Sequence, residues 1–522
     1  MEILLVLVCP LIGALLLAFV GHRPWADNLN VLFCALTFFA ALFLANTIAS
    51  GPLLAANGQF LADALNIFLV VLTTFVAMTT AIFSRSYLRE DLVHGRLSAQ
   101  RMRLFHGLYQ IFIFCMLLVL LTNNMGLLWV ATEAATLATV LLVSLYRTPA
   151  SLEAAWKYFI LCSVGIAQAL FGTILLYFAA ERVLGGSAGK LGTDALLWTH
   201  LTQISGSLDP TVMSIAFVFL LVGYGTKVGL VPLHNWLPDA HAEGPTPVSA
   251  VLSGLLLNVA LYALLRCKVL VDGSLRSDFA GNLLMGFGLL SVLVAAFFLW
   301  RQRDIKRLFA YSSIEHMGIA TFAFGLGGAV ASFAGLLHMT VHSLTKSALF
   351  FSAGHAAQSA GTQVIANIRG LLRTSPAIGW GLMLGTIAIL GVPPFGVFAS
   401  EFLILTTAIK TQAWCAALLC IALVVAFAAM LAKVQAMVFA DPGVAESMTL
   451  TPRNQLPRGT SASNTHANHE KTNSSALSRI NLIFMHSPTY LHLAIVLMLG
   501  LYIPPQLADW FRQAARMLGQ VT

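Results

Sequence analysis

The sequence has 522 residues, of which 58% are hydrophobic and only 10% are charged, and its mean hydropathy is +0.84. This composition excludes a soluble globular domain, because apolar runs of about 20 residues, each long enough to cross a bilayer as a helix, recur along the chain. The formal net charge of +8 does not indicate nucleic-acid binding, since the cations lie in short loops between these runs. The seven cysteines form no CxxC pair, so neither an iron–sulfur cluster nor a zinc site is predicted.

The apolar runs predict an all-α polytopic membrane protein with about 14 transmembrane helices. The first run lacks the basic start and the cleavage site of a secretory signal, so we expect it to be a retained span. A polar stretch before the last run, 441–485, is rich in Ser, Thr, Asn and His and predicts a cytoplasmic linker. The predicted spans are 2–20, 31–50, 63–84, 104–122, 124–146, 156–181, 211–232, 246–266, 280–300, 307–326, 329–353, 377–408, 412–440 and 486–506.

The loop charges predict the orientation in the membrane. When alternate loops are assigned to the two sides, most Lys and Arg residues gather on one side, including those of 85–103 and 301–307. The other side has fewer cations, among them Arg266 and Lys268. The positive-inside rule therefore predicts that both termini lie outside the cytoplasm.

The apolar run 212–231 carries Lys227 in its middle and is followed by Pro232. A charge at the bilayer centre costs roughly 2.5–3.5 kcal/mol on insertion scales, so it is retained where it faces a protein interior or a water-filled cavity. The proline removes a backbone donor and ends the helix, which predicts a broken span. The alternative is a kinked helix whose lysine snorkels to the surface, but Lys227 lies far from either end of the run.

Glu133 is a lone carboxylate inside the predicted span 124–146. A buried carboxylate needs a cation or a proton, and Lys227 is its natural partner. The alternative is a protonated Glu133 that makes a structural hydrogen bond. If the two residues do not interact, Asp239 and then Glu401 are the next candidates to pair with the lysine.

His338, His342 and Lys346 follow one another at spacing i, i+4, i+8 in the predicted span 329–353. On an α-helix they share one face and rise ~12 Å along it, which is typical of a segment of a proton path. Histidine titrates near neutral pH and can therefore pass a proton on. The pattern supplies no third or fourth zinc ligand, and two histidines one turn apart cannot reach opposite faces of a haem, so neither group is predicted.

Glu401 follows a second helix break in the sequence AILGVPPFGVFASEFLIL, and we expect it to be a terminal proton donor. The alternative is a carboxylate that binds a freed backbone N–H. Paired interrupted spans in two halves indicate a transporter built from inverted repeats. The two breaks have matching offsets: Pro232, Trp236 and Asp239 in the first, and Pro394, Phe398 and Glu401 in the second.

Together these residues resemble the antiporter-like family shared by large membrane subunits of respiratory complex I, multisubunit cation/proton antiporters and membrane-bound hydrogenases. The resemblance covers nearly all of the predicted spans. It is carried by Glu133, by Lys157 in EAAWKYFI, by Lys227 with PLHNWLPDAH (which contains Asp239 and His241) and GPTPVSA, by DIKRLFAYSSIEHMG with Lys306, by HMTVHSLTKSALFFSAG, and by Glu401.

The resemblance implies two inverted five-helix repeats, each with one broken helix. It divides the chain into three N-terminal spans (1–103), a first repeat (104–266), a second repeat (280–440), the polar linker (441–485) and the last span with the C-terminus (486–522). The implied proton pathway is Glu133, Lys157, Lys227, Lys306, His338, His342, Lys346 and Glu401, with Asn258, Asp239, His241 and Lys433 as accessory residues.

One residue departs from the family pattern. Family members commonly carry a lysine or histidine in the eighth span, where this sequence has Asn258. Asparagine cannot hold a proton at neutral pH, so transfer into the second half would rely on water, His338 or His342.

The resemblance also implies a multi-pass subunit of a bacterial inner membrane that couples electron transfer in partner subunits to proton movement, with Na⁺ as an alternative ion. The expected partners are other membrane subunits, including further antiporter-like ones, and soluble nickel–iron hydrogenase-type and iron–sulfur subunits. We expect no cofactor and no catalytic residue in this chain. Two alternatives are a self-contained cation/proton antiporter and a membrane anchor that does not pump.

Overall fold

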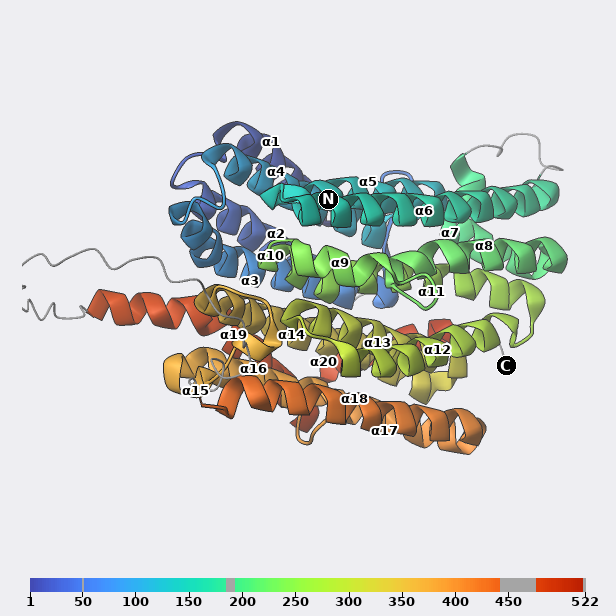
Figure 1. Ribbon diagram of the computed structural model, residues 1–522. Coiled ribbons are helices and arrows are strands. Elements are labelled where there is room, and N and C mark those ends of the chain that lie inside the picture. Colours follow the sequence, from blue (N-terminus) through green and yellow to red (C-terminus); the bar gives the residue numbers. More distant parts are fainter. Residues whose placement is uncertain (49–50, 185–192, 442–475, 520–522) are drawn as a thin grey trace, which may run out of the picture.

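The computed structural model describes residues 1–48, 51–184, 193–441 and 476–519. Its long helices lie side by side, with α1 and α4 at one flank and α17 and α18 at the opposite flank (Figure 1). The N-terminal part contains α1 (Glu2–Val20), α2 (Ala26–Ile48) and α3 (Ala64–Val93). A small antiparallel hairpin, β1 (Leu53–Ala55) with β2 (Phe60–Ala62), precedes α3 and is an addition to the all-α fold that the sequence predicts.

The two halves of the chain follow in order and pack against each other. The first half contains α4 (Ala99–Leu121), α5 (Met125–Val143), α6 (Pro149–Leu184), α7 (Trp198–Ile204), α8 (Pro210–Val228), α9 (Trp236–Glu243), α10 (Thr246–Val251), a π-helical turn at Leu252–Leu256 and α11 (Leu257–Leu275). The second half contains α12 (Phe279–Arg301), α13 (Ile305–Leu326), α14 (Gly328–Ala360), α15 (Leu371–Thr374), α16 (Pro376–Ile389), α17 (Gly396–Thr411) and α18 (Ala413–Phe439). The last helices are α19 (Ala476–Leu501) and α20 (Pro505–Leu518).

The polytopic helical fold predicted from the sequence is confirmed. Within the described residues, ten helices are long and apolar enough to cross a membrane, or eleven if the pair bent by 72° between α19 and α20 is one span. The count of 14 stays a prediction. Helices α13 and α14 are rich in polar side chains, and a break divides α16 from α17, so these helices do not meet the criterion of length and hydropathy.

Both halves contain an interrupted helix, as the two proline motifs predict. Helix α8 ends at Val228 and α9 begins at Trp236, whereas α16 ends at Ile389 and α17 begins at Gly396. A glycine in the left-handed region follows each first segment: Gly229 has φ +82° and Gly391 has φ +64°. Glycine adopts this conformation without steric cost, which allows each helix to stop within the protein interior. The inverted relation of the two halves and the domain boundaries stay predictions.

Small residues bring α6 and α8 into close contact. A Cβ added at Gly223 of α8 would lie 2.5 Å from the Cβ of Ala169 on α6, and one added at Gly165 of α6 would lie 2.8 Å from Thr226. Such contacts stabilise helix pairs in membranes, where van der Waals packing replaces the hydrophobic effect. The packing fixes the end of α8, and therefore Lys227, against α6.

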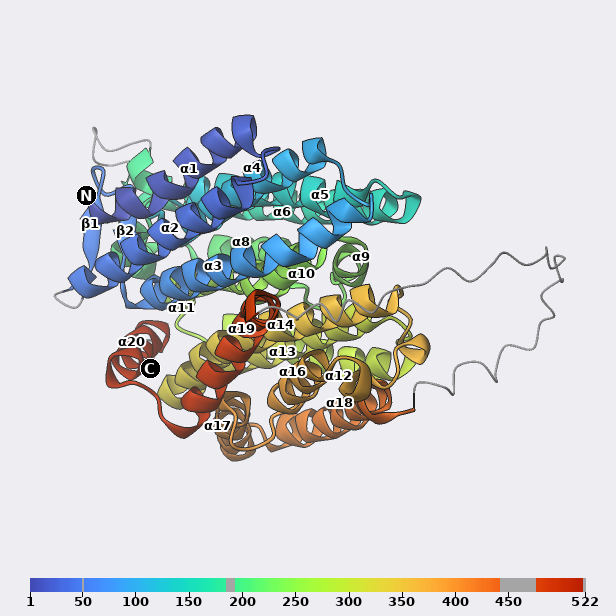
Figure 2. The ribbon, with the colours of Figure 1, turned by 90° about the vertical axis from the view of Figure 1, so that its left-hand side faces the viewer.

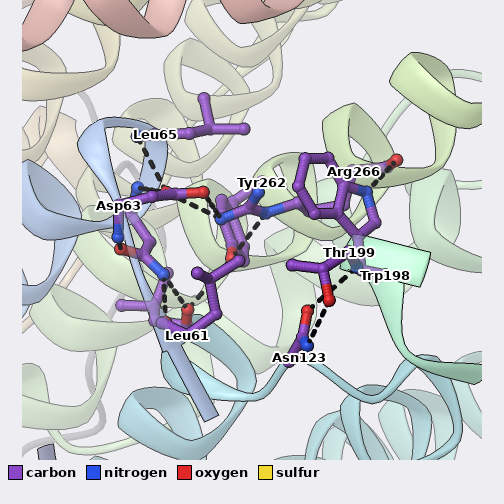
Figure 3. Close-up of polar contacts among 10 residues, drawn as sticks. Leu61, Asp63, Leu65, Asn123, Trp198, Thr199, Tyr262 and Arg266 are labelled. Carbon is purple, nitrogen blue, oxygen red and sulfur yellow. Dashed lines mark hydrogen bonds and ion pairs between the residues drawn. The ribbon is translucent and has the colours of Figure 1, made fainter. Parts of the chain in front are cut away.

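The three N-terminal spans are joined to the first half by a buried ion pair (Figure 3). Arg266 of α11 is only 2% exposed and lies 2.7 Å from the carboxylate of Asp63, which also caps α3. The guanidinium packs against the rings of Trp198, at 4.3 Å, and Tyr262, at 5.1 Å from the ring centroids. The prediction that Arg266 is a loop cation is therefore wrong, because Asp63 neutralises its charge inside the protein.

The C-terminal helices cross the second half. Figure 2 shows α19 running across α14 towards α20, which lies near the N-terminal end of α3. Helix α19 begins at Ala476, inside the stretch predicted to be a linker. Most of that linker, 442–475, lies outside the described residues.

Candidate ion-translocation site

Lys227 is 0% exposed and lies in the last turn of α8. Its ammonium group donates a hydrogen bond to the hydroxyl of Thr136 on α5 and lies 5.0 Å from the ring centroid of Tyr158 on α6. The negative end of the helix dipole also favours a cation at this position. A lysine that snorkels to the surface is thereby excluded.

Side chains form hydrogen bonds with backbone groups at the helix break beside Lys227. The indole N–H of Trp236 donates to the carbonyl of Thr226 at 2.8 Å, and the backbone N–H of Val231 donates to the hydroxyl of Ser291 at 2.9 Å. Trp236 also stacks on Tyr158 with ring centroids 4.6 Å apart. These two hydrogen bonds help the break to persist at membrane depth, because each pairs a backbone group at the break.

Glu133 does not form the direct ion pair with Lys227 that the sequence suggests. One of its carboxylate oxygens accepts a hydrogen bond from Ser163 at 2.9 Å, and the other is buried without a hydrogen-bond partner among the described residues. Among the described residues, the charged groups of Glu133 and Lys227 are not within the 4.0 Å of an ion pair. The two charges nevertheless interact electrostatically. Thr136, one turn along α5 from Glu133, is the group that contacts the lysine.

Lys306 opens onto a polar cleft. The cleft has a volume of about 350 Å³ and is lined by side chains that include Arg96, Glu243 and Lys306. The ammonium group donates to the carbonyl of Gly244 at 2.8 Å. The cleft lies on the side of the membrane that the loop charges assign to the cytoplasm.

His241 lies between the cleft and the buried lysine of the second half. It is 0% exposed and stacks on Phe350 with ring centroids 5.1 Å apart. It interacts electrostatically with both Lys306 and Lys346. Neither of its ring nitrogens has a hydrogen-bond partner among the described residues. His241 is therefore a buried ring near both ammonium groups.

Lys346 has a carboxylate partner that was not predicted from the sequence. Its ammonium group donates to the carbonyl of Phe309 at 3.0 Å and interacts electrostatically with Glu315. Both charged side chains are buried. The signal was present in DIKRLFAYSSIEHMG, because a carboxylate inside a span is a functional-site hypothesis by default.

The two predicted histidines of α14 meet a third one on α13. The rings of His338 and His342 stack on His316 with centroids 5.2 and 5.8 Å apart, so the prediction that they share one helix face is confirmed. Nδ1 of His316 lies 3.2 Å from Nε2 of His338 and 3.8 Å from the carboxylate of Glu401 on α17. The fold thus supplies the third and fourth ionisable groups that the spacing on α14 lacks.

Asn258 joins the two halves. Its amide N–H₂ donates to the carbonyl of Met339 at 2.9 Å and to the hydroxyl of Ser343 at 2.7 Å, both on α14. Ser343 in turn donates to the carbonyl of Gly254 in the π-helical turn. Asn258 therefore binds α11 to α14 through hydrogen bonds and contributes no titratable group.

Three residues of the predicted proton pathway and its accessory set lie away from the buried ionisable side chains described above. Lys157 is half-exposed on α6 and forms ion pairs with Glu153 at 2.6 Å and Asp239 at 3.3 Å. Asp239 also pairs with Arg307 at 2.7 Å, so its partners are Lys157 and Arg307 and not Lys227. The ammonium group of Lys433 donates to two backbone carbonyls at the end of α12, at 2.9 and 2.6 Å, and stabilises that helix end.

The family described as "NADH:quinone oxidoreductase/Mrp antiporter, TM" matches residues 122–426, a range that contains Glu133, Lys227, Lys346, His316, His338, His342 and Glu401. The chain belongs to this family. It is 47% identical over 513 residues to the hydrogenase-4 component F homolog of Methylacidiphilum infernorum (isolate V4), covering 98% of this chain and 99% of that protein. The motifs of this sequence also resemble those of hydrogenase-4 component F.

Solved structures show the same fold. A chain of the archaeal membrane-bound sulfane sulfur reductase aligns with a TM-score of 0.80 and 22% identity over 99% of this chain and 98% of that one. A chain of the Mrp complex from Dietzia sp. DQ12-45-1b aligns with a TM-score of 0.78 and 19% identity over 99% and 97%. At these identities the likeness establishes the fold alone.

Proposed function

We propose that this chain translocates protons as an antiporter-like membrane subunit of a hydrogenase- or respiratory-type complex. The observation that carries the proposal is a row of ionisable side chains in both halves. It consists of the part-buried Glu133 and the buried Lys227, Lys346, His316, His338, His342 and Glu401. Charged groups at membrane depth are costly, so such a row is retained for ion movement.

In the first half, Glu133 and Lys227 form the switch. The lysine is held by a hydroxyl, an aromatic ring and a helix end, while the carboxylate lies beyond 4.0 Å. A movement of α5 that brings Glu133 closer would favour the charged lysine, and a movement away would favour release of its proton. The switch therefore depends on the separation of α5 and α8.

In the second half, a proton would enter through the cleft at Lys306 and pass by His241 to Lys346. From there it would reach His342, His338 and finally Glu401. Transfer from Lys227 into this half would use water beside Asn258, because the asparagine orients hydrogen bonds without itself taking a proton.

The proposed partners follow from the relatives. A relative named hydrogenase-4 component F homolog and the family name NADH:quinone oxidoreductase/Mrp antiporter both point to multisubunit complexes. We therefore assign electron transfer to soluble nickel–iron hydrogenase-type and iron–sulfur subunits, with further antiporter-like subunits beside this chain. The proposed location is a bacterial inner membrane with both termini in the periplasm.

The test is proton translocation by the purified complex in liposomes. Lys227→Ala should abolish acidification of the lumen, whereas electron transfer to an artificial acceptor should stay near the wild-type rate. Lys410→Ala, which changes an exposed lysine at the end of α17, is the matched control and should pump normally. Undiminished pumping by an assembled Lys227→Ala complex would refute the proposed function.

A further inference from the structure

Three side chains from three helices converge at one point in the second half. They are His316 of α13, His338 of α14 and Glu401 of α17, and one nitrogen or oxygen of each lies within 4.8 Å of the others. The two ring nitrogens that face each other are 3.2 Å apart, and a Glu401 oxygen is 3.8 Å from His316. Ligands of a tetrahedral Zn²⁺ with bonds of about 2.0–2.1 Å are separated by roughly 3.4 Å. The spacing therefore suits a metal ion with little rearrangement.

The hydrogen bonds orient His338 as a ligand. The hydroxyl of Ser400 donates to the carbonyl of Val397 at 2.8 Å, so its oxygen accepts the hydrogen bond from Nδ1–H of His338 at 2.9 Å. Nε2 of His338 is then the unprotonated nitrogen, and it points at His316 and Glu401. Metal-binding histidines characteristically donate their other ring N–H to such a partner, which fixes the tautomer and the orientation of the ring.

The Glu401 carboxylate is positioned to act as a metal ligand, and one of its oxygens has no hydrogen-bond partner among the described residues. The Glu401 oxygen that faces His316 is buried and has no hydrogen-bond partner among the described residues. The other oxygen packs against Gly391, where an added Cβ would lie only 2.1 Å from it. The glycine at the helix break thus makes room for the carboxylate. The side chain of Glu401 keeps 10% of its surface exposed, so the site is not sealed.

We propose that His316, His338 and Glu401 bind a divalent transition-metal ion of the Zn²⁺ type. Two imidazoles and one carboxylate favour Zn²⁺, Co²⁺ or Ni²⁺ over Mg²⁺ and Ca²⁺, which prefer all-oxygen sites. The fourth ligand is a water or His342, whose ring nitrogens lack hydrogen-bond partners among the described residues. The inference does not depend on proton translocation, but a bound ion would join α13, α14 and α17 and block the proposed proton route.

The test is direct metal binding by the whole complex in nanodiscs, purified with a tag that contains no histidine. Titration with Co²⁺ should show saturable binding of one ion per chain, with the intense visible absorption of four-coordinate Co²⁺, and Zn²⁺ should displace it. Glu401→Gln and His316→Gln should each weaken Zn²⁺ binding by ~10-fold or more, and Ser400→Ala by roughly 10–100-fold. His492→Gln is the matched control: this buried histidine of α19 bonds Thr79 and the carbonyl of Leu344, away from the site, so affinity should not change.

A fourth variant keeps the test decisive if the others fail to assemble. His338→Cys retains a ligand and should add a thiolate-to-Co²⁺ charge-transfer band in the near ultraviolet. Absence of saturable binding by the wild-type complex, equal affinity in Glu401→Gln and His316→Gln, or absence of the band in a folded His338→Cys complex would each overturn the proposal. Binding is measured without electron donor or gradient, so its outcome is separate from that of the Lys227→Ala pumping assay.

Discussion

Removing the hydroxyl of Thr136 should destabilise the protein only while Lys227 is present. The hydroxyl accepts a hydrogen bond from the buried ammonium group, and Thr136→Val removes that acceptor without changing the side-chain volume much. A hydrogen bond to a charged group contributes ~1.5–3 kcal/mol. Couplings measured between helices of a membrane protein average about 0.6 kcal/mol and reach about 1.7 kcal/mol. We therefore expect a coupling of about 1–2 kcal/mol in the double-mutant cycle of Thr136→Val and Lys227→Met.

The assay is reversible denaturant unfolding in mixed micelles, which gives the free energy of unfolding for the wild type, the two single variants and the double variant. Thr132→Val is the matched control. Thr132 lies one turn earlier on α5, is buried, and donates only to the carbonyl of Leu128 in its own helix. Because the Thr132 side chain makes no hydrogen bond to Lys227 among the described residues, its cycle with Lys227→Met should be additive within ~0.3–0.5 kcal/mol.

A second double-mutant cycle distinguishes the contribution of Thr136 from that of Glu133. Because Glu133 lies beyond 4.0 Å and is bonded to Ser163, the cycle of Glu133→Gln with Lys227→Met should show a smaller coupling than the Thr136 cycle. The double variants should still fail to pump, since both lack the lysine. Additivity in the Thr136 cycle, or a larger coupling for Glu133, would refute this account of how the lysine is stabilised.

Three further predictions address other parts of the structure. Asn258→Lys or Asn258→His should raise proton translocation by the complex in liposomes or shift its pH dependence, because either change restores a titratable group; unchanged pumping over the pH range would show that water already carries the step. Gly391→Ala should lower the free energy of unfolding by at least ~1–2 kcal/mol, because alanine is strained at φ +64° and its Cβ would displace Glu401; a melting curve like that of the wild type would contradict this. Asp63→Ala should destabilise the protein by ~3–5 kcal/mol in the same denaturant assay, because it leaves Arg266 buried without a counter-ion; a loss below 1 kcal/mol would show that Trp198 and Tyr262 suffice.

The features that the sequence predicted correctly depend on short stretches of chain. Lys227 within an apolar run and Pro232 after it are enough to predict a buried lysine at a helix break, since both the cost of the charge and the missing N–H are local. The shared face of His338 and His342 follows from helix geometry alone. These predictions need no knowledge of which helices are neighbours.

The features that could not be predicted depend on how helices rotate and pack. Lys157 and Lys346 both lie in helices, yet one is half-exposed and ion-paired at the surface while the other is fully buried. A nearly uniform apolar background does not reveal which face of a membrane helix turns inward. Glu315 and His316 are adjacent in the motif DIKRLFAYSSIEHMG, but their contacts depend on the approach of α14 and α17 to α13.

The two helix breaks show how similar patterns lead to different sites. Asp239 and Glu401 stand at the same offset from Pro232 and Pro394, which suggests equivalent carboxylates. Asp239, however, lies where Lys157 and Arg307 neutralise it, whereas Glu401 faces two histidines in the interior. Two cations surround the first carboxylate, whereas the second lies beside imidazole nitrogens with which it could hold the proposed metal ion. The second break therefore places its carboxylate beside two histidines, whereas the first places a buried lysine at the end of α8.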